Sequence, residues 1–199
     1  MQTRANRRQV IARSIAIAGA ATALLPPVDT DAAVPAPRTD GQVLAGTLEV
    51  EKLVVLAYRQ VLASGALGAG IQGTAAQLLQ HEDEHVAALA AALRRLGAAP
   101  SVGPTNVASA DKALAAHQVS TSLTNLRTER DCLQLLIDVE AVAEGAYFIA
   151  ISKLRDSSSL RLSAEIMACE AQHWTALSEL LHPGDLASAV PSPFVEGYP

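Results

Sequence analysis

Acidic and imidazole side chains interrupt apolar helical stripes at four places in this chain of 199 residues. A carboxylate that faces a protein core is unfavourable unless it is paired or binds a cation. Two of the acidic residues are followed three positions later by a histidine, which places both side chains on one helix face. Four such interruptions therefore point to one shared cation site, and its residues are Glu51, Glu82, His85, Glu140, Glu170 and His173.

The interruptions fall at matching levels of two expected helical hairpins. Reflection of the first helix onto the second about Leu67 brings position 51 opposite position 83, between Glu82 and His85. Reflection about Asp156 brings position 140 opposite position 172, between Glu170 and His173. Each hairpin should therefore bring one glutamate level with one Glu-x-x-His pair.

The two halves of the chain also repeat. Glu51 and Tyr58 recur 89 positions later as Glu140 and Tyr147. The Glu-x-x-His pair at residues 82–85 recurs 88 positions later at residues 170–173. Such a repeat predicts a site on a pseudo-twofold axis, with two metal ions in nearly equivalent surroundings.

The elements that must position these residues are all helical. Half of the residues are hydrophobic and only 3% are aromatic, which favours helices over a β-sandwich. Apolar residues recur at helical spacing and predict helices near 43–64, 73–96, 122–155 and 160–181. The turns within each pair of helices are short, whereas residues 98–121 form a long connection with a short helix around Lys112. The sequence thus predicts an all-α four-helix bundle, made of two hairpins joined by one long crossover.

The ordered set Glu-x6-Tyr, Glu-x-x-His, Glu-x6-Tyr, Glu-x-x-His resembles the doubled motif of the ferritin-like di-iron carboxylate superfamily, which includes bacterioferritin and rubrerythrin. The resemblance covers residues 44–182 and is closest to exported bacterial ferritin-like domains. It implies that Glu82 and Glu170 bridge two metal ions and that Glu51 and Glu140 are terminal or bridging ligands. It further implies that each histidine caps one ion, and that each tyrosine holds a carboxylate of the neighbouring hairpin; these residues are His85, His173, Tyr58 and Tyr147.

These ligand types suit iron, with manganese or a mixed manganese–iron pair as the alternative. The activity implied is that of an oxidoreductase or ferroxidase, in which O2 or H2O2 oxidises two bound ferrous ions. A non-catalytic protein that sequesters metal for stress protection, and a bundle whose site is only a structural staple, are the alternatives. Haem is not expected, because the helix-2 methionine that binds haem in bacterioferritin is missing here.

Four other residues can also bind metal or form cross-links, and the sequence predicts a role for each. Glu144 lies one turn beyond Glu140 and is either an extra ligand or a residue at the edge of the core. His81, one turn before His85, is expected on a solvated flank, with a hydrogen bond near the site as the alternative. Cys169 is expected to be a small core residue, and its predicted distance from Cys132 disfavours a disulfide.

The N-terminal segment has the order of a secretory signal: positive charge, a short apolar stretch, then small residues. Arg7 and Arg8, followed by Val10 and Ile11, resemble a twin-arginine signal, with an ordinary Sec signal as the alternative. We therefore expect an export signal at residues 1–36, a linker at 37–43, the bundle at 44–182 and an irregular tail at 183–199. The mature protein would reside in the periplasm, in the cell envelope or outside the cell.

Charge and composition limit the partners. The formal net charge of −5 argues against nucleic acid as a partner. No apolar run reaches the roughly 20 residues that span a bilayer, so no membrane span is expected in the mature chain. Two cysteines are too few for a disulfide framework or a cysteine-based zinc site. The expected partners are metal ions and O2 or H2O2, and a homodimer is compatible with the sequence.

Overall fold

The computed structural model describes residues 38–193 and residue 197, and this part of the chain contains helices and no strand. The export signal expected at residues 1–36 lies outside the described residues. None of the described helices is both long and apolar enough to cross a membrane. The helices are α1 (Asp40–Ser64), α2 (Ala69–Arg95), α3 (Val107–Ala116), α4 (Glu129–Ile151), α5 (Ser157–Leu181) and α6 (Leu186–Ala189).

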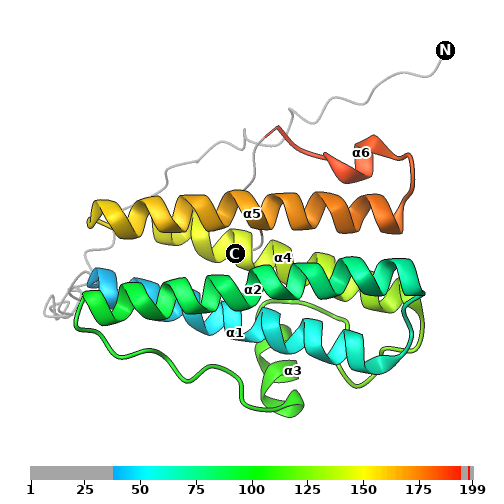
Figure 1. The fold of residues 1–199 in the computed structure, drawn as a ribbon, viewed down its shortest axis with the longest axis horizontal. Helices are drawn as coiled ribbons and strands as arrows, with labels where there is room; N and C mark the ends of the chain where they lie inside the picture. The colour runs from blue at the N-terminus through cyan, green and yellow to red at the C-terminus, as the bar shows by residue number, and fades with distance from the viewer. Residues whose placement is uncertain (1–37, 194–196, 198–199) are drawn as a thin grey trace, which may run out of the picture. The chain divides into compact units, whose positions relative to one another are not determined.

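Four long helices run lengthwise and make up the body of the bundle (Figure 1). Helices α1 and α2 form one hairpin, α4 and α5 form the other, and α1 packs on α4 while α2 contacts α5. The connection from residue 96 to residue 128 contains α3, which packs against α1. This architecture confirms the prediction of an all-α bundle of two hairpins joined by a long crossover.

Polar capping groups set where the helices begin, and they shift two of the expected boundaries. Helix α1 begins at Asp40 because the Thr39 hydroxyl accepts a hydrogen bond from the backbone N–H of Gln42, whose side chain accepts one from the Thr39 N–H. Helix α4 begins at Glu129, seven residues later than expected, because Thr128 and Asp131 form the same reciprocal cap. A reciprocal cap satisfies two N–H groups that the first helical turn leaves unpaired.

Hydrogen bonds at one end of the bundle join three of the long helices. The Asp40 carboxylate, in the first turn of α1, accepts hydrogen bonds from the backbone N–H groups of Arg155 and Asp156, in the turn between α4 and α5. Asp156 in turn caps α5 through the N–H of Ser159 and pairs with Arg95 of α2 at 2.8 Å. These contacts fix the level of α1 and α2 relative to the second hairpin.

The buried apolar residues form two clusters, one on each side of the polar interruptions. One cluster contains Leu44, Leu48 and Leu89. The other contains Val54, Leu136 and Leu177, among others. Because Glu51 lies between Leu48 and Val54 along α1, the polar residues fall between the two clusters, and apolar packing closes the site at both ends of the bundle.

The C-terminal segment contains a short helix that was not predicted from the sequence. Residues 183–199 were expected to be irregular, but Leu186–Ala189 form the short helix α6, which packs against α5. The carboxylate of Asp185 accepts hydrogen bonds from the N–H groups of Ala187 and Ser188 and so starts this helix.

Candidate metal centre

The six residues predicted from the apolar stripes converge inside the bundle. Helix α1 supplies Glu51, α4 supplies Glu140, and α2 and α5 each supply a Glu-x-x-His pair. All four glutamates have no solvent exposure, and the histidines are 9% and 2% exposed. The six side chains are Glu51, Glu82, His85, Glu140, Glu170 and His173.

The donor atoms of these residues fall into two groups of four, each compact enough to surround one cation. The first group is Glu51, Glu82, His85 and Glu170, and the second is Glu82, Glu140, Glu170 and His173. Within each group the donor atoms lie within 4.8 Å of one another. Glu82 and Glu170 belong to both groups, as expected of carboxylates that bridge two ions.

Each shared carboxylate turns one oxygen toward each histidine. Glu82 places Oε2 3.3 Å from Nδ1 of His85 and Oε1 2.7 Å from Nδ1 of His173. Glu170 does the same, with Oε1 3.0 Å from His85 and Oε2 3.2 Å from His173. The unshared glutamates each face one histidine: Glu51 lies 3.9 Å from His85 and Glu140 lies 3.6 Å from His173. The arrangement is nearly symmetric, as the repeat predicts.

Two buried tyrosines connect the hairpins at the site. The hydroxyl of Tyr58 in α1 donates a hydrogen bond to Glu140 in α4, and the hydroxyl of Tyr147 in α4 donates one to Glu51 in α1. Burial, reinforced by the adjacent carboxylates, raises the pKa of both phenols well above the ordinary value. The raised pKa favours the protonated hydroxyls, which donate to the two carboxylates.

Burial also controls protonation of the carboxyl groups. Loss of solvation raises the pKa of Glu51, and the charges of Glu170 and Glu82 add to the effect. The same cause raises the pKa of Glu170, where the charge of Glu140 contributes, and that of Glu140, where the charge of Glu82 contributes. Three closely spaced carboxyl groups thus resist ionisation unless positive charge is present.

The two histidines provide some of that positive charge. Burial alone would raise the pKa of Glu82, but the close approach of the His173 and His85 imidazoles outweighs it and lowers the pKa to about 2. Burial likewise opposes charging of His85, whereas its hydrogen bond to Glu82 and the charge of Glu51 raise its pKa to about 9. The pKa of His173 rises further still, because Glu140, Glu170 and Glu82 all face it.

Hydrogen bonding at the site is incomplete. Among the described residues, eight buried side-chain nitrogen and oxygen atoms lack a hydrogen-bond partner, and six of them lie here. Some are close to opposite charge, such as Nδ1 of His173 near Glu82, but the geometry is not that of a hydrogen bond. Buried polar groups without partners are rare in folded proteins and need a specific explanation. The six atoms are Oε2 of Glu51, Oε1 of Glu82, Oε2 of Glu140, both oxygens of Glu170 and Nδ1 of His173.

Glu144 lies near the site but outside both groups of donor atoms. It is buried, with 6% exposure, one helical turn beyond Glu140. Burial and the charge of Glu140 raise its pKa to about 7. Its position at the margin favours the second of the two predicted roles, a residue at the edge of the core.

The prediction of a solvated flank for His81 was wrong. Its ring is half-buried and stacks on His173, with ring centroids 5.2 Å apart, and its Nδ1 lies 3.0 Å from Nε2 of His173. Cys169, also half-buried, places Sγ 3.3 Å from the same nitrogen. Helix periodicity alone missed this cluster, because the neighbour of His81 lies on another helix. The signal was present in the repeat, since His81 and Cys169 are 88 positions apart, the same offset as Glu82 and Glu170.

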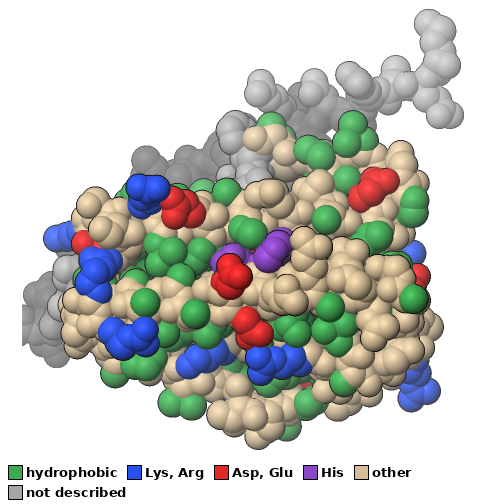
Figure 2. All heavy atoms as spheres, in the orientation of Figure 1, with side chains coloured by type: hydrophobic (Ala, Val, Ile, Leu, Met, Phe, Trp, Pro, Cys, Tyr) green, Lys and Arg blue, Asp and Glu red, His purple; other side chains and the backbone are tan. Residues whose placement is uncertain are grey.

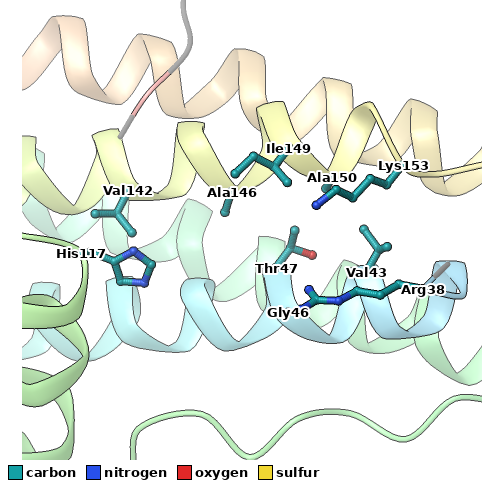
Figure 3. A pocket seen from close by; sticks show the side chains of 10 residues that line it. All are labelled: Arg38, Val43, Gly46, Thr47, His117, Val142, Ala146, Ile149, Ala150 and Lys153. Carbon is teal, nitrogen blue, oxygen red and sulfur yellow. The ribbon is translucent and has the colours of Figure 1, made fainter. Parts of the chain in front are cut away.

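A groove on the outside of the bundle does not belong to this site. It lies between α1 and α4 and encloses a cavity of about 190 Å³. Arg38 and Lys153 lie toward one end and His117 toward the other, with apolar side chains such as Ala146 and Ile149 between them (Figure 3). None of the residues that line it is among the six buried donors.

Comparison with known proteins agrees with the fold. The sequence model of a family described as a ferritin-like domain matches residues 39–183. The match covers most of the chain, and the protein therefore belongs to the ferritin-like domain family. Searches of curated proteins and of solved structures gave no significant match.

Proposed function

We propose that this protein binds two iron ions, or manganese in their place, and acts as an oxidoreductase of the ferroxidase type with O2 or H2O2 as oxidant. Glu51, His85 and the shared carboxylates of Glu82 and Glu170 would hold one ion. Glu140, His173 and the same two carboxylates would hold the other. The observation that supports this most strongly is the sharing of Glu82 and Glu170 between two four-residue groups of donors.

The residues present fit such a pair of ions in charge and in ligand type. Four carboxylates carry four negative charges when ionised, which two divalent cations neutralise. Carboxylate oxygens with one imidazole for each ion suit iron and manganese. The six buried atoms without a hydrogen-bond partner would become ligand atoms, which explains why they are tolerated in a core. Protons held by the carboxyl groups with raised pKa would be released as the ions bind.

When bound, iron supplies the electrons that reduce the oxidant. The protein itself would orient the ligand carboxylates and exclude bulk water from the site. Tyr58 and Tyr147 hold one oxygen each of Glu140 and Glu51, so these carboxylates pivot about a fixed hydrogen bond. The two apolar clusters keep bulk water from both ends of the site. Burial and the charge of Glu140 raise the pKa of Glu144 to about 7, so this carboxyl group would gain or lose a proton near neutral pH.

The proposal is tested by anaerobic loading of ferrous iron followed by exposure to O2 in a stopped-flow instrument. We expect rapid absorbance changes from ferric carboxylate species together with O2 consumption. Glu170→Gln should lose both signals, because it removes a ligand from each ion. Glu165→Gln is the matched control, since Glu165 is an exposed residue of the same helix, paired only with Arg161.

Tight binding of two ferrous ions without rapid oxidation would favour the alternative, a protein that sequesters metal. That result would leave the binding site intact and overturn the oxidoreductase proposal. If neither iron nor manganese binds to the wild-type chain, both functions are excluded.

We further propose that the protein is exported by a twin-arginine route after it has folded around its metal. This route carries folded proteins, whereas the Sec route carries unfolded chains. Buried carboxylates destabilise the native state when no cation is present, and ligand binding stabilises it by mass action. Loading before export would also let the cell select the metal, because intrinsic affinities favour copper and zinc over manganese and iron.

A further inference from the structure

The ring of His173 separates two different sets of side chains. Its Nδ1 faces the buried carboxylates, with Glu82 at 2.7 Å. Its Nε2 points the other way, 3.0 Å from Nδ1 of His81 and 3.3 Å from Sγ of Cys169. One face of the imidazole is thus part of the carboxylate site, and the other belongs to a separate outer cluster of His81, Cys169 and His173.

This outer cluster contains more side chains than are needed to hydrogen-bond Nε2 of His173. A metal-binding histidine commonly donates its second ring N–H to one acceptor, which fixes the ring. Here two possible partners, His81 and Cys169, surround a nitrogen that can take part in only one hydrogen bond. The three donor atoms lie within 4.8 Å of one another, close enough to surround a single cation.

We propose that His81, Cys169 and His173 form a second metal site, which shares only His173 with the carboxylate site, for a thiophilic ion, Zn²⁺ or copper. Two imidazole nitrogens and one thiolate are ligands that these ions prefer, whereas the carboxylate site suits iron or manganese. Three protein ligands leave a fourth tetrahedral position for water. On binding, the Cys169 thiol forms the metal–sulfur bond and gives its proton to solvent, and Nε2 of His173 likewise releases its proton as it becomes a ligand. This inference goes beyond the proposed function and does not depend on it.

The outer cluster is also placed where an ion can arrive from solvent. His81 and Cys169 are both half-buried, in contrast to the fully buried glutamates. Figure 2 shows histidine side chains at the surface between α2 and α5, midway along the molecule. Metal can therefore reach the outer cluster without crossing the apolar core.

The internal repeat explains how the outer ligands come together. His81 and Cys169 each directly precede a Glu-x-x-His pair and occupy equivalent positions in the two halves. A pseudo-twofold axis that brings Glu82 and Glu170 together also brings His81 and Cys169 together, one layer closer to the surface.

The proposal is tested by titration of Co²⁺, a spectroscopic substitute for Zn²⁺, into the full chain with reduced cysteines. Only a cobalt–thiolate bond gives the near-ultraviolet charge-transfer band, so Co²⁺ in the carboxylate site does not interfere. We expect this band to saturate at one ion per chain. Cys169→Ser should abolish it, and His81→Gln should weaken the binding that produces it at least tenfold. Cys132→Ser is the matched control and should retain the band, because Cys132 lies in a different cluster of the core.

Glu51→Gln separates this proposal from the proposed function. Glu51 lies on the His85 side of the carboxylate site, so this variant should bind iron poorly and keep the cobalt–thiolate band. The proposal is overturned if the wild-type chain shows no band while Cys169 reacts as a free thiol. It is also overturned if the band survives Cys169→Ser, or if His81→Gln binds as tightly as wild type. Thermal melts of each variant establish that it is folded.

Discussion

Replacement of Tyr58 by phenylalanine removes one hydroxyl from the centre of the bundle and nothing else. That hydroxyl donates a hydrogen bond to Oε1 of Glu140. Both residues are fully buried, so water cannot take the place of the lost donor. The other oxygen of Glu140 already lacks a hydrogen-bond partner. Tyr58→Phe therefore leaves a buried carboxylate with no hydrogen bond to either oxygen.

Loss of this hydrogen bond should lower both the stability of the protein and its affinity for iron. A hydrogen bond to a charged group contributes about 1.5–3 kcal/mol to the free energy of unfolding. For a chain of this size, 1 kcal/mol corresponds to roughly 2–4 °C in Tm. Tyr58→Phe should thus lower the Tm of the metal-stripped protein by about 3–12 °C. Because Glu140 is then held less firmly, iron affinity should fall by about 10- to 100-fold.

The assay combines chemical unfolding of the metal-stripped protein with anaerobic titration of ferrous iron. Tyr147→Phe removes the equivalent bond to Glu51 and should behave alike. Ser64→Ala is the matched control, because that hydroxyl donates to the backbone of its own helix, at Val61. Unchanged stability and unchanged iron affinity in Tyr58→Phe would refute the assignment of the tyrosines as supports of the carboxylates.

Three other results are expected. In the metal-stripped protein, the stabilisation that comes from charged His85 is complete below its ordinary pKa of 6.5 and is lost as pH rises through about 9. The Tm should therefore fall across this interval, and a Tm that rises there would contradict the pairing of His85 with the buried carboxylates. Glu144→Gln removes a carboxyl group whose pKa is raised to about 7, so the variant should gain stability above pH 7 and still bind two iron ions, whereas loss of one ion would make Glu144 a ligand. Replacement of Arg7 and Arg8 by lysines should abolish export, as followed by immunoblots of cell fractions, and unchanged export would mean that the arginine pair is incidental.

The sequence alone was sufficient to predict the features that repeat with helical period. Glu51 and Glu140 stand out because each interrupts an apolar stripe, and reflection across a short turn is enough to place each beside a Glu-x-x-His pair. These features depend only on helix geometry and on the level of neighbouring helices, both of which the apolar pattern determines. The tyrosine hydrogen bonds, in contrast, were implied by the resemblance of the doubled motif to a known superfamily.

Features that depend on capping or on contacts between hairpins were harder to predict. Leu126 continues the apolar stripe of α4, yet the helix begins only at Glu129, because the reciprocal cap of Thr128 and Asp131 stops it there. His81 was assigned to a solvated flank because periodicity describes one helix at a time. Its contact with His173 depends on how closely α2 and α5 approach, which the sequence does not state.

The central claim is that six buried side chains hold two metal ions between them. It is tested most directly by a crystal structure of the iron-loaded protein, with anomalous diffraction measured at the iron absorption edge. The account predicts two anomalous peaks, roughly 3.5–4 Å apart as in other two-metal sites. Glu82 and Glu170 should each contact both peaks, while His85 and His173 should contact one each. A single peak, a peak outside this group of residues, or no peak in a fully loaded crystal would contradict the account.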